Sequence, residues 1–227
     1  MIHYTLRHTA RTATAAMVLS AAACIPYTVG TTAQTERPGH SSRTISMYVI
    51  PNGISLDTSR ASGHSLRGSD AEVRYGLDAR SDIGLRIPAA SGMVVTYKRR
   101  LGADTSSTRA AVAVMGGGGL VNFGEHALAQ LTIIASGREP AQAGVSAYGG
   151  FHAVQVAPLS SGAAHDTPTI GLFTGLRIGD HENAVSPEVG LFYDHSALHI
   201  RRGDLMVVPS ITVRGDGLLR MLPRFLR

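Results

Sequence analysis

Residues 72–101, EVRYGLDARSDIGLRIPAASGMVVTYKRRL, predict the fold of this 227-residue chain. Apolar and polar residues alternate through the stretch in three runs, and a β-strand points successive side chains to opposite faces. The apolar members of the first two runs are Val73, Tyr75, Leu77, Ile83, Leu85 and Ile87. Short polar segments at 78–81 and 88–92 separate the runs, as in hairpins. The stretch therefore predicts three antiparallel strands joined by two tight turns.

The opposite face of these strands carries charges of both signs. Its members are Glu72, Arg74, Asp78, Asp82, Arg86, Lys98 and Arg100. A water-soluble barrel would expose such a face to solvent, whereas a small membrane barrel turns its apolar face to lipid and its polar face to the lumen. Alternation alone leaves both arrangements open. In the membrane arrangement, the six apolar residues point outward and the seven charged residues form a network in the lumen.

A family resemblance rests on the same residues. The phrase VRYGL at 73–77, followed by DIGLR at 82–86 and a basic strand at 95–100, resembles a hairpin pattern of outer-membrane β-barrel proteins of Gram-negative bacteria. The likeness extends in style from about Thr44 to Arg214, and only the hairpin is specific. It implies contact with outer-membrane lipid and a location in the outer membrane. The group shares an architecture but no catalytic residues, so the resemblance implies no enzymatic role.

The start of the chain is typical of an export signal. Arg7 and Arg11 precede a short uncharged run, TATAAMVLSAAA at 12–23. This run is shorter than the ~20 apolar residues of a transmembrane helix. We therefore expect residues 1–23 to be a signal peptide.

Cys24 follows this run directly and is the only cysteine of the chain. The sequence LSAAAC at 19–24 resembles a bacterial lipoprotein cleavage box, which implies that Cys24 is lipidated. It departs from the family pattern at Ala21, where Leu is preferred. Cleavage by an ordinary signal peptidase, with Cys24 unmodified, remains the alternative. A single cysteine forms no internal disulfide, so stability must come from the fold.

The remaining chain divides into three parts. Residues 24–43 are rich in Thr, Ser, Pro and Gly without periodicity and are interpreted as a linker or N-terminal arm. Residues 44–215 form the predicted barrel domain, with 51–70 mostly loop. Residues 216–227 form a basic C-terminal tail. Further strands are expected at 44–50, 109–115, 127–135, 144–156, 169–178, 188–194, 197–202 and 205–214.

These segments predict one all-β domain. No amphipathic helix of ten residues appears between 44 and 215, and regular strand spacing favours an antiparallel up-and-down barrel of about 8–10 strands. The four glycines at 116–119 lack the Lys-Ser/Thr of a phosphate-binding loop and indicate a loop or a close approach of neighbours. No basic run accompanies the net charge of +5, so nucleic acid is not an expected partner.

Two observations weigh against a membrane barrel. Tryptophan is absent and aromatic residues make up 5% of the chain, whereas membrane barrels carry aromatic girdles. Several predicted strands also have only seven or eight residues, below the ~9–11 of a full span. A thin girdle would have to come from Tyr75, Tyr97, Tyr148, Phe151, Phe173, Phe192 and Tyr193.

Three groups of residues are candidates for chemistry. Outer-membrane lipid A deacylases place a His and a Ser one residue apart on a strand face, but His195 and Ser196 are adjacent and would face opposite sides. His195 and His199 would lie ~13 Å apart in a strand, too far for one metal ion. Asp180, His181 and Glu182 fit a solvated turn. The sequence thus predicts no catalytic residue, metal site or cofactor.

Three functions are compatible with these patterns. The first is an outer-membrane β-barrel of structural or permeability-related role. The second is a lipid-anchored periplasmic β-barrel that binds a small apolar ligand or a protein partner. The third, and the least favoured by the sequence, is an outer-membrane lipid-modifying hydrolase. The direction in which the apolar faces point distinguishes the first from the second.

Overall fold

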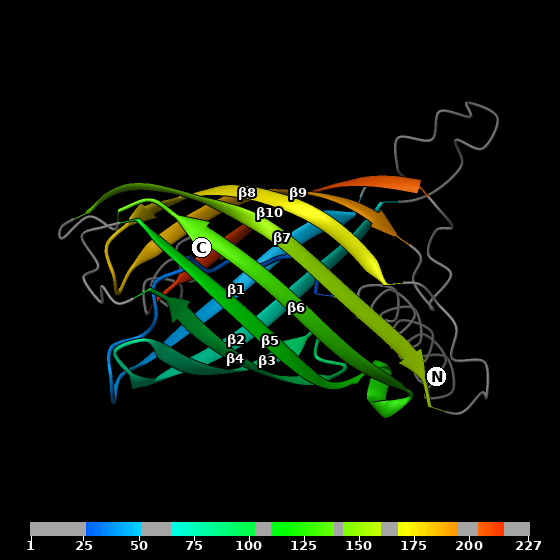
Figure 1. Cartoon of the computed structure of the whole chain (residues 1–227). Helices are drawn as coiled ribbons and strands as arrows, with labels where there is room; N and C mark the ends of the chain where they lie inside the picture. Colours follow the sequence, from blue (N-terminus) through cyan, green and yellow to red (C-terminus); the bar gives the residue numbers. More distant parts are fainter. Residues whose placement is uncertain are drawn as a thin grey trace, which may run out of the picture.

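The computed structural model describes residues 26–50, 65–102, 110–138, 143–159, 168–194 and 204–215, which build a closed antiparallel β-barrel (Figure 1). Ten strands follow one another around the barrel in chain order, and β1 pairs with both β2 and β10. The strands are β1 (Ser41–Ile50), β2 (Leu66–Asp78), β3 (Ser81–Pro88), β4 (Met93–Leu101), β5 (Ala111–Val121), β6 (His126–Ser136), β7 (Gly144–Pro158), β8 (Thr169–Gly179), β9 (Ala184–Asp194) and β10 (Asp204–Arg214). The predicted fold class is confirmed.

Backbone pairing closes the barrel along β1. All ten residues of β1 pair with β2, from Ser41 opposite Tyr75 to Ile50 opposite Leu66. On its other edge β1 pairs with β10, where Thr44 lies opposite Arg214. Closure gives each of the ten described strands a partner on both edges. A bilayer requires this arrangement because lipid offers no hydrogen-bond partner.

The two openings of the barrel differ. β1 begins and β10 ends at one opening, here called the terminal mouth, together with the connections 79–80, 102–110, 137–143 and 180–183. The other opening, called the long-loop mouth, holds the connections 51–65, 89–92, 122–125, 159–168 and 195–203.

The outer face of the barrel is apolar, as the membrane arrangement predicts. Val73, Tyr75, Leu77, Ile83, Leu85 and Ile87 are 38–49% exposed. Arg74, Asp82 and Arg86 are at most 2% exposed and point inward. The outward apolar residues continue around the barrel through Val95, Val112, Leu131, Ile133, Leu172, Leu176, Val189, Leu191 and Ile211.

Most strands are longer than the ranges predicted from the alternation of apolar and polar residues. They run from 8 to 15 residues, and β2 begins at Leu66 inside the segment expected to be loop. β5 continues through the four glycines, which pair with β4 and β6. Ladder hydrogen bonds join backbones, so pairing continues where side chains no longer alternate. The expectation that several strands are shorter than nine residues therefore holds only for β3, with eight; the other nine described strands have nine or more. The predicted strand 197–202 and the tail 216–227 lie outside the described residues.

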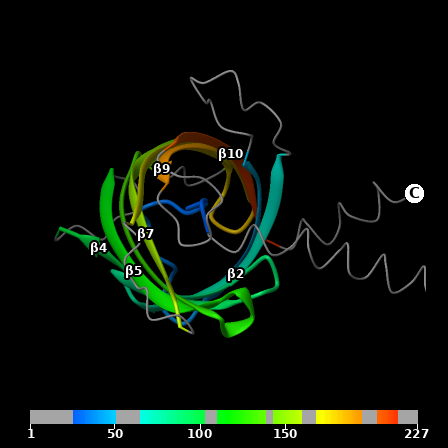
Figure 2. The same cartoon turned by 90° about the vertical axis from the view of Figure 1, so that its right-hand side faces the viewer.

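Residues 26–36 lie inside the barrel. Figure 2 shows this first described segment, in blue, within the ring of strands. Most of its side chains are buried, including Tyr27, Thr28, Val29 and Ala33. Residues 26–36 are called the lumen segment below. Part of the expected linker or arm thus fills the interior, and β1 begins at Ser41, before the expected domain boundary.

None of the described residues forms a helix long and apolar enough to cross a bilayer.

The apolar outer face predicts a depth-dependent cost of charge. Val189 lies in the middle of β9 and Leu205 near the start of β10, and both are 47% exposed. Val189→Arg should lower the free energy of unfolding in lipid vesicles by about 2–4 kcal/mol and Leu205→Arg by about 0–1 kcal/mol. Urea titration of the folded gel band measures both, and equal costs would contradict a bilayer around the strands.

Candidate functional site in the barrel lumen

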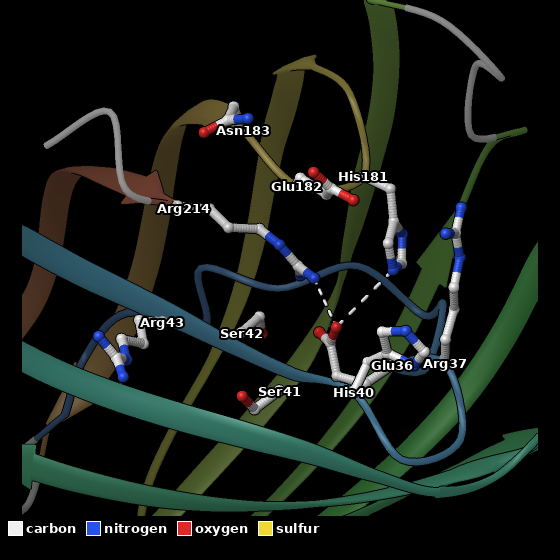
Figure 3. Close-up of a pocket in the computed structure, with 11 residues that line it drawn as sticks. Glu36, Arg37, His40, Ser41, Ser42, Arg43, His181, Glu182, Asn183 and Arg214 are labelled. Atoms are coloured by element: carbon white, nitrogen blue, oxygen red, sulfur yellow. Dashed lines mark hydrogen bonds and ion pairs between the residues drawn. The ribbon is translucent and has the colours of Figure 1, made fainter.

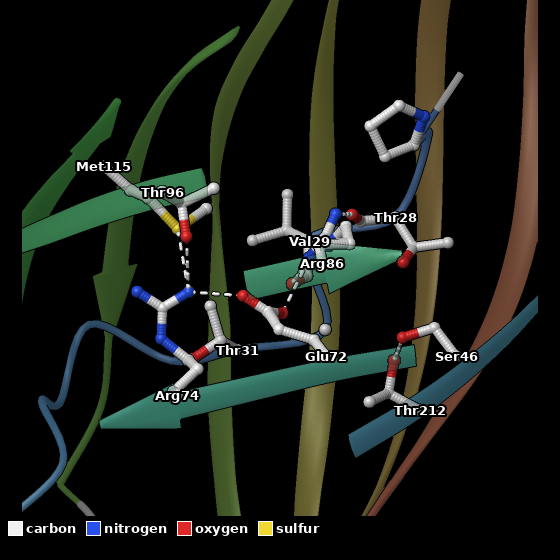
Figure 4. A network of polar contacts seen from close by, with 12 residues as sticks. Thr28, Val29, Thr31, Ser46, Glu72, Arg74, Arg86, Thr96, Met115 and Thr212 are labelled. Carbon is white, nitrogen blue, oxygen red and sulfur yellow. Dashed lines mark hydrogen bonds and ion pairs between the residues drawn. The ribbon is translucent and has the colours of Figure 1, made fainter. Parts of the chain in front are cut away.

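A cluster of buried ion pairs lines one side of the lumen (Figure 4). Glu72 accepts hydrogen bonds from Arg74 (Oε1–Nη1, 2.5 Å) and from Arg86 (Oε2–Nη2, 3.0 Å). Arg74 also donates through Nε to Asp82 Oδ1 at 2.9 Å, and Lys98 Nζ lies 3.3 Å from Asp82 Oδ2. Each carboxylate contacts two cations, so the two carboxylates compensate the three cations in part.

Gly84 provides the space for this cluster. It lies on β3 with its α-carbon facing the lumen, opposite Arg74 on β2. A Cβ at Gly84 would approach Thr96 Oγ1 to 2.6 Å and Arg74 Nη1 and Glu72 Oε1 to 2.7 Å. Those contacts are below van der Waals distance. The glycine of the DIGLR phrase is thus explained by the guanidinium group packed above it.

Six of the seven charged residues predicted for the lumen are buried there, and Asp78 is the exception. Asp78 is exposed at the end of β2, where its carboxylate accepts hydrogen bonds from the Arg80 backbone N–H (2.7 Å) and from Ser81 Oγ (2.5 Å). The register of β2 and β3 shifts between Gly76 and Asp78. Because of this shift, the alternation of β2 no longer predicts on which face of the strand Asp78 lies. The placement of Asp78 in the network was wrong.

Cations of the wall bind backbone carbonyls of the lumen segment. Arg86 donates to the carbonyls of Thr28 (2.8 Å) and Val29 (3.2 Å). Lys98 Nζ donates to the Thr31 hydroxyl (3.1 Å) and to the carbonyls of Thr32 (3.2 Å) and Gln34 (2.6 Å). The segment thus supplies acceptors that the two wall carboxylates alone do not provide.

Carboxylates of the wall accept the N–H groups of the same segment. Glu188 accepts from Val29 N (2.9 Å) and Gly30 N (3.0 Å), and Tyr148 Oη donates to it at 2.9 Å. Asp82 accepts from Glu36 N at 3.0 Å. These are hydrogen bonds to charged groups, stronger than neutral ones. The wall holds the segment mainly through its backbone.

A histidine fixes the beginning of the lumen segment. His152 Nε2 lies 3.2 Å from the carbonyl oxygen of Pro26, and Nδ1 lies 2.7 Å from Thr132 Oγ1. A carbonyl only accepts, so Nε2 carries the proton, and in the neutral ring Nδ1 accepts from the threonine hydroxyl.

The lumen is apolar near the long-loop mouth. Tyr27 packs edge-on against Phe192 (5.4 Å between ring centroids) and Tyr48 (6.4 Å). The surrounding buried residues are Ile50, Val94, Val121, Leu128, Val154, Val156, Met206 and Val208. Phe192, and likewise Tyr148 and Phe173, face inward, so they were wrongly assigned to an external girdle. Tyr75, Tyr97 and Tyr193 do face outward.

At the terminal mouth the segment ends in an ion pair. Glu36 accepts a hydrogen bond from Arg214 Nη2 at 2.5 Å, and His181 Nε2 lies 3.7 Å from the same oxygen (Figure 3). A polar cavity of about 560 Å³ opens beside them. Burial acts to raise the pKa of Glu36, but the charge and hydrogen bond of Arg214 outweigh it and hold that pKa below the ordinary value.

The chain then turns into β1 against the backbone of β2. Gly39 N donates to Gly76 O (2.9 Å) and Gly76 N donates to His40 O (3.0 Å). A side chain on Gly76 would overlap the carbonyl of Arg37. Glycine at this position of the VRYGL phrase therefore permits the close approach of the segment.

The other candidate residues show no catalytic arrangement. Asp180 closes the β8–β9 turn by accepting from the backbone N–H groups of Glu182 (2.8 Å) and Asn183 (2.6 Å), and the Asn183 bond is the main cause of its lowered pKa. Within the described residues no group of three His, Cys, Asp or Glu side chains is placed to hold a metal ion. Cys24, His195, Ser196 and His199 lie outside the described residues.

Several residues that lie in the lumen were not predicted to lie there from the sequence. Period-two alternation with Val189 and Leu191 would have placed Glu188 inside. Glu36, in contrast, stands in a segment without periodicity. No pattern pairs it with Arg214, which lies 178 residues away.

No protein-family model matches the chain, and no curated protein sequence matches it. Among solved structures, the chain is similar to Ail, the attachment invasion locus protein of Yersinia pestis. The complex of Ail with the heparin analogue sucrose octasulfate shares 14% identity over 78% of this chain and 97% of that chain, with a TM-score of 0.31. Ail alone shares 13% identity over the same fractions, with a TM-score of 0.26. Similarity of this degree carries no inference about function.

Removing one buried cation tests the wall cluster. Arg86→Met leaves Glu72 with one partner and two backbone carbonyls without their donor, so the free energy of unfolding should fall by about 3–5 kcal/mol. Arg43→Met is the control, because Arg43 is exposed at the start of β1 and should cost about 0–1 kcal/mol. Heat-modifiable gel migration reports both. An unchanged transition in Arg86→Met would contradict the buried network.

The pair at the terminal mouth predicts a pH dependence. Glu36→Gln should cost about 1.5–3 kcal/mol at neutral pH, the value of a hydrogen bond to a charged group. Because the pKa of Glu36 is lowered on folding, the wild-type advantage exists above the unfolded pKa and is lost as pH falls through the folded pKa. Urea titrations of wild type and variant from neutral to acidic pH measure it. A difference independent of pH would show that Glu36 is not ionised.

Proposed function

We propose that this protein is an outer-membrane β-barrel of structural or permeability-barrier role, whose lumen is closed by its own N-terminal segment. One observation carries the proposal. The ten-stranded wall has an apolar outer face and a charged inner face, and residues 26–36 occupy its interior. The predicted signal peptide at 1–23 and the expected contact with outer-membrane lipid agree with this location.

The outer face supports a lipid environment. Aliphatic side chains exposed around the whole barrel would form an apolar surface far beyond the few hundred Å² that soluble monomers usually expose. Lipid-facing strands also require all backbone groups to be paired, which closure provides. The water-soluble periplasmic alternative gives no reason for this surface.

The filled lumen supports a barrier rather than a diffusion pore. Side chains alone fill a barrel of about eight strands, and a wider barrel leaves room for more. Here the additional room holds the lumen segment, and the wall binds it through Arg86, Lys98 and Glu188. The cavity at the terminal mouth is lined by arginine, histidine and glutamate, which does not favour an apolar ligand.

An enzymatic role is not part of the proposal. The buried charged groups of the wall form ion pairs with one another. His195 and Ser196, the candidates for lipid hydrolysis, lie outside the described residues.

Conductance tests the closed lumen. Purified protein refolded into a planar bilayer should show no steady ion conductance, because residues 26–36 fill the lumen. A variant lacking residues 27–36 should conduct in those preparations in which a heat-modifiable gel band shows that the wall has formed. Steady conductance by the full chain would contradict the barrier role.

A further inference from the structure

The lumen segment runs from one mouth of the barrel to the other. Tyr27 packs near the long-loop mouth beside Ile50, the last residue of β1, and Met206, near the start of β10. Glu36 lies at the terminal mouth, paired with Arg214, the last residue of β10. An extended chain of eleven residues reaches roughly 35 Å, and the hydrocarbon core of a bilayer is ~30 Å thick. The segment is long enough to cross the membrane inside the wall.

The number of crossings determines where the two ends of the chain leave. The ten antiparallel strands are an even number, so β1 begins and β10 ends at the same mouth. The lumen segment adds one more crossing before β1, and its turn against Gly76 sits at that same terminal mouth. Pro26 and Gly215, the first and last described residues, therefore lie at opposite mouths.

The connections indicate which mouth faces outward. Three of the five connections at the long-loop mouth, 51–65, 159–168 and 195–203, have nine residues or more. At the terminal mouth one of four, 102–110, reaches nine. Outer-membrane barrels have short turns in the periplasm and longer loops outside. The long-loop mouth is therefore the extracellular one in the proposed outer-membrane setting.

We propose that the barrel threads residues 26–36 through its lumen and so presents the start of the mature chain, residues 24–25 after removal of the predicted signal peptide, at the cell surface, while the chain after Gly215 stays in the periplasm. This rests on the proposed outer-membrane location. It makes the lumen a conduit that the chain itself occupies, in addition to a barrier. Lipidation of Cys24 is a separate expectation, and the threading holds with or without it.

The wall is built to retain the threaded chain along its whole length. His152 holds the Pro26 carbonyl near one mouth, Arg86 and Glu188 hold residues 28–30, and Lys98 holds residues 31–34. Ala33 N donates to Ser136 Oγ (3.3 Å), and Asp82 and Arg214 hold Glu36 at the other mouth. Most of these bonds join charged side chains of the wall to backbone atoms of the segment. Withdrawal of the segment would therefore leave buried charges of the wall without these partners.

Two matched insertions into the full chain test the display. One variant carries an epitope between Cys24 and Ile25, and the other carries the same epitope between Gly215 and Asp216. On intact cells an antibody should detect the first epitope as strongly as after permeabilisation. The second should be detected only once the outer membrane is permeabilised.

The outcomes separate threading from location. Both epitopes on one side of the membrane would overturn threading, and an inner first epitope with an outer second one would overturn surface display. Absence of both proteins from the outer-membrane fraction would instead overturn the proposed function on which display rests.

A second measurement tests threading without an inserted epitope. Ala33→Cys and Ser136→Cys are combined in a Cys24→Ser chain, because the backbone N–H of Ala33 lies 3.3 Å from Ser136 Oγ, so that the two positions are neighbours. The folded protein should form an internal disulfide, seen as a shift in gel migration on reduction. Each single substitution serves as control. A folded barrel that forms no disulfide would overturn the threaded position of the segment.

Discussion

Charges removed from water must find partners, and the interior of this barrel is arranged around that requirement. Glu72 and Asp82 compensate Arg74, Arg86 and Lys98 in part, and the lumen segment provides the other acceptors. An unpaired buried charge costs several kcal/mol, whereas the same charge bound to partners of good geometry does not. The wall cluster and the segment therefore depend on each other for stability.

The composition of the lumen segment fits this role. Its central residues, Thr28 to Ala33, have small side chains, so the extended backbone passes between wall side chains and presents its polar groups to them. The side chains at the two ends of the segment make its specific contacts with the wall. Tyr27 is enclosed by aromatic and aliphatic residues at one mouth, and Glu36 pairs with Arg214 at the other.

The apolar outer face and the closed interior follow from the same alternation of side chains. Outward residues such as Leu85 and Val189 give the wall its apolar outer surface, and inward residues such as Arg86 and Glu188 hold the segment. One additional crossing of the chain then changes the topology, because an even-stranded barrel otherwise returns both ends to one side. A barrel filled in this way holds Pro26 near one mouth and Gly215 at the other.

Local features could be predicted from the sequence: alternation in the segment 72–101 indicated antiparallel strands, the placement of Leu85 and Arg86 on opposite faces, and the all-β class. Which of the two faces points outward followed from closure of the barrel. Strand extent, the exposed position of Asp78 and the inward direction of Phe192 were decided by the tertiary structure, since pairing register and the shift at Gly76 are set between strands. The lumen segment could not be predicted either. It has no periodicity, and its partners stand as far as 178 residues away. The alternation of a strand shows only which of its residues share a face. A backbone threaded through the lumen is held by side chains from different strands, and only closure of the barrel brings those side chains together.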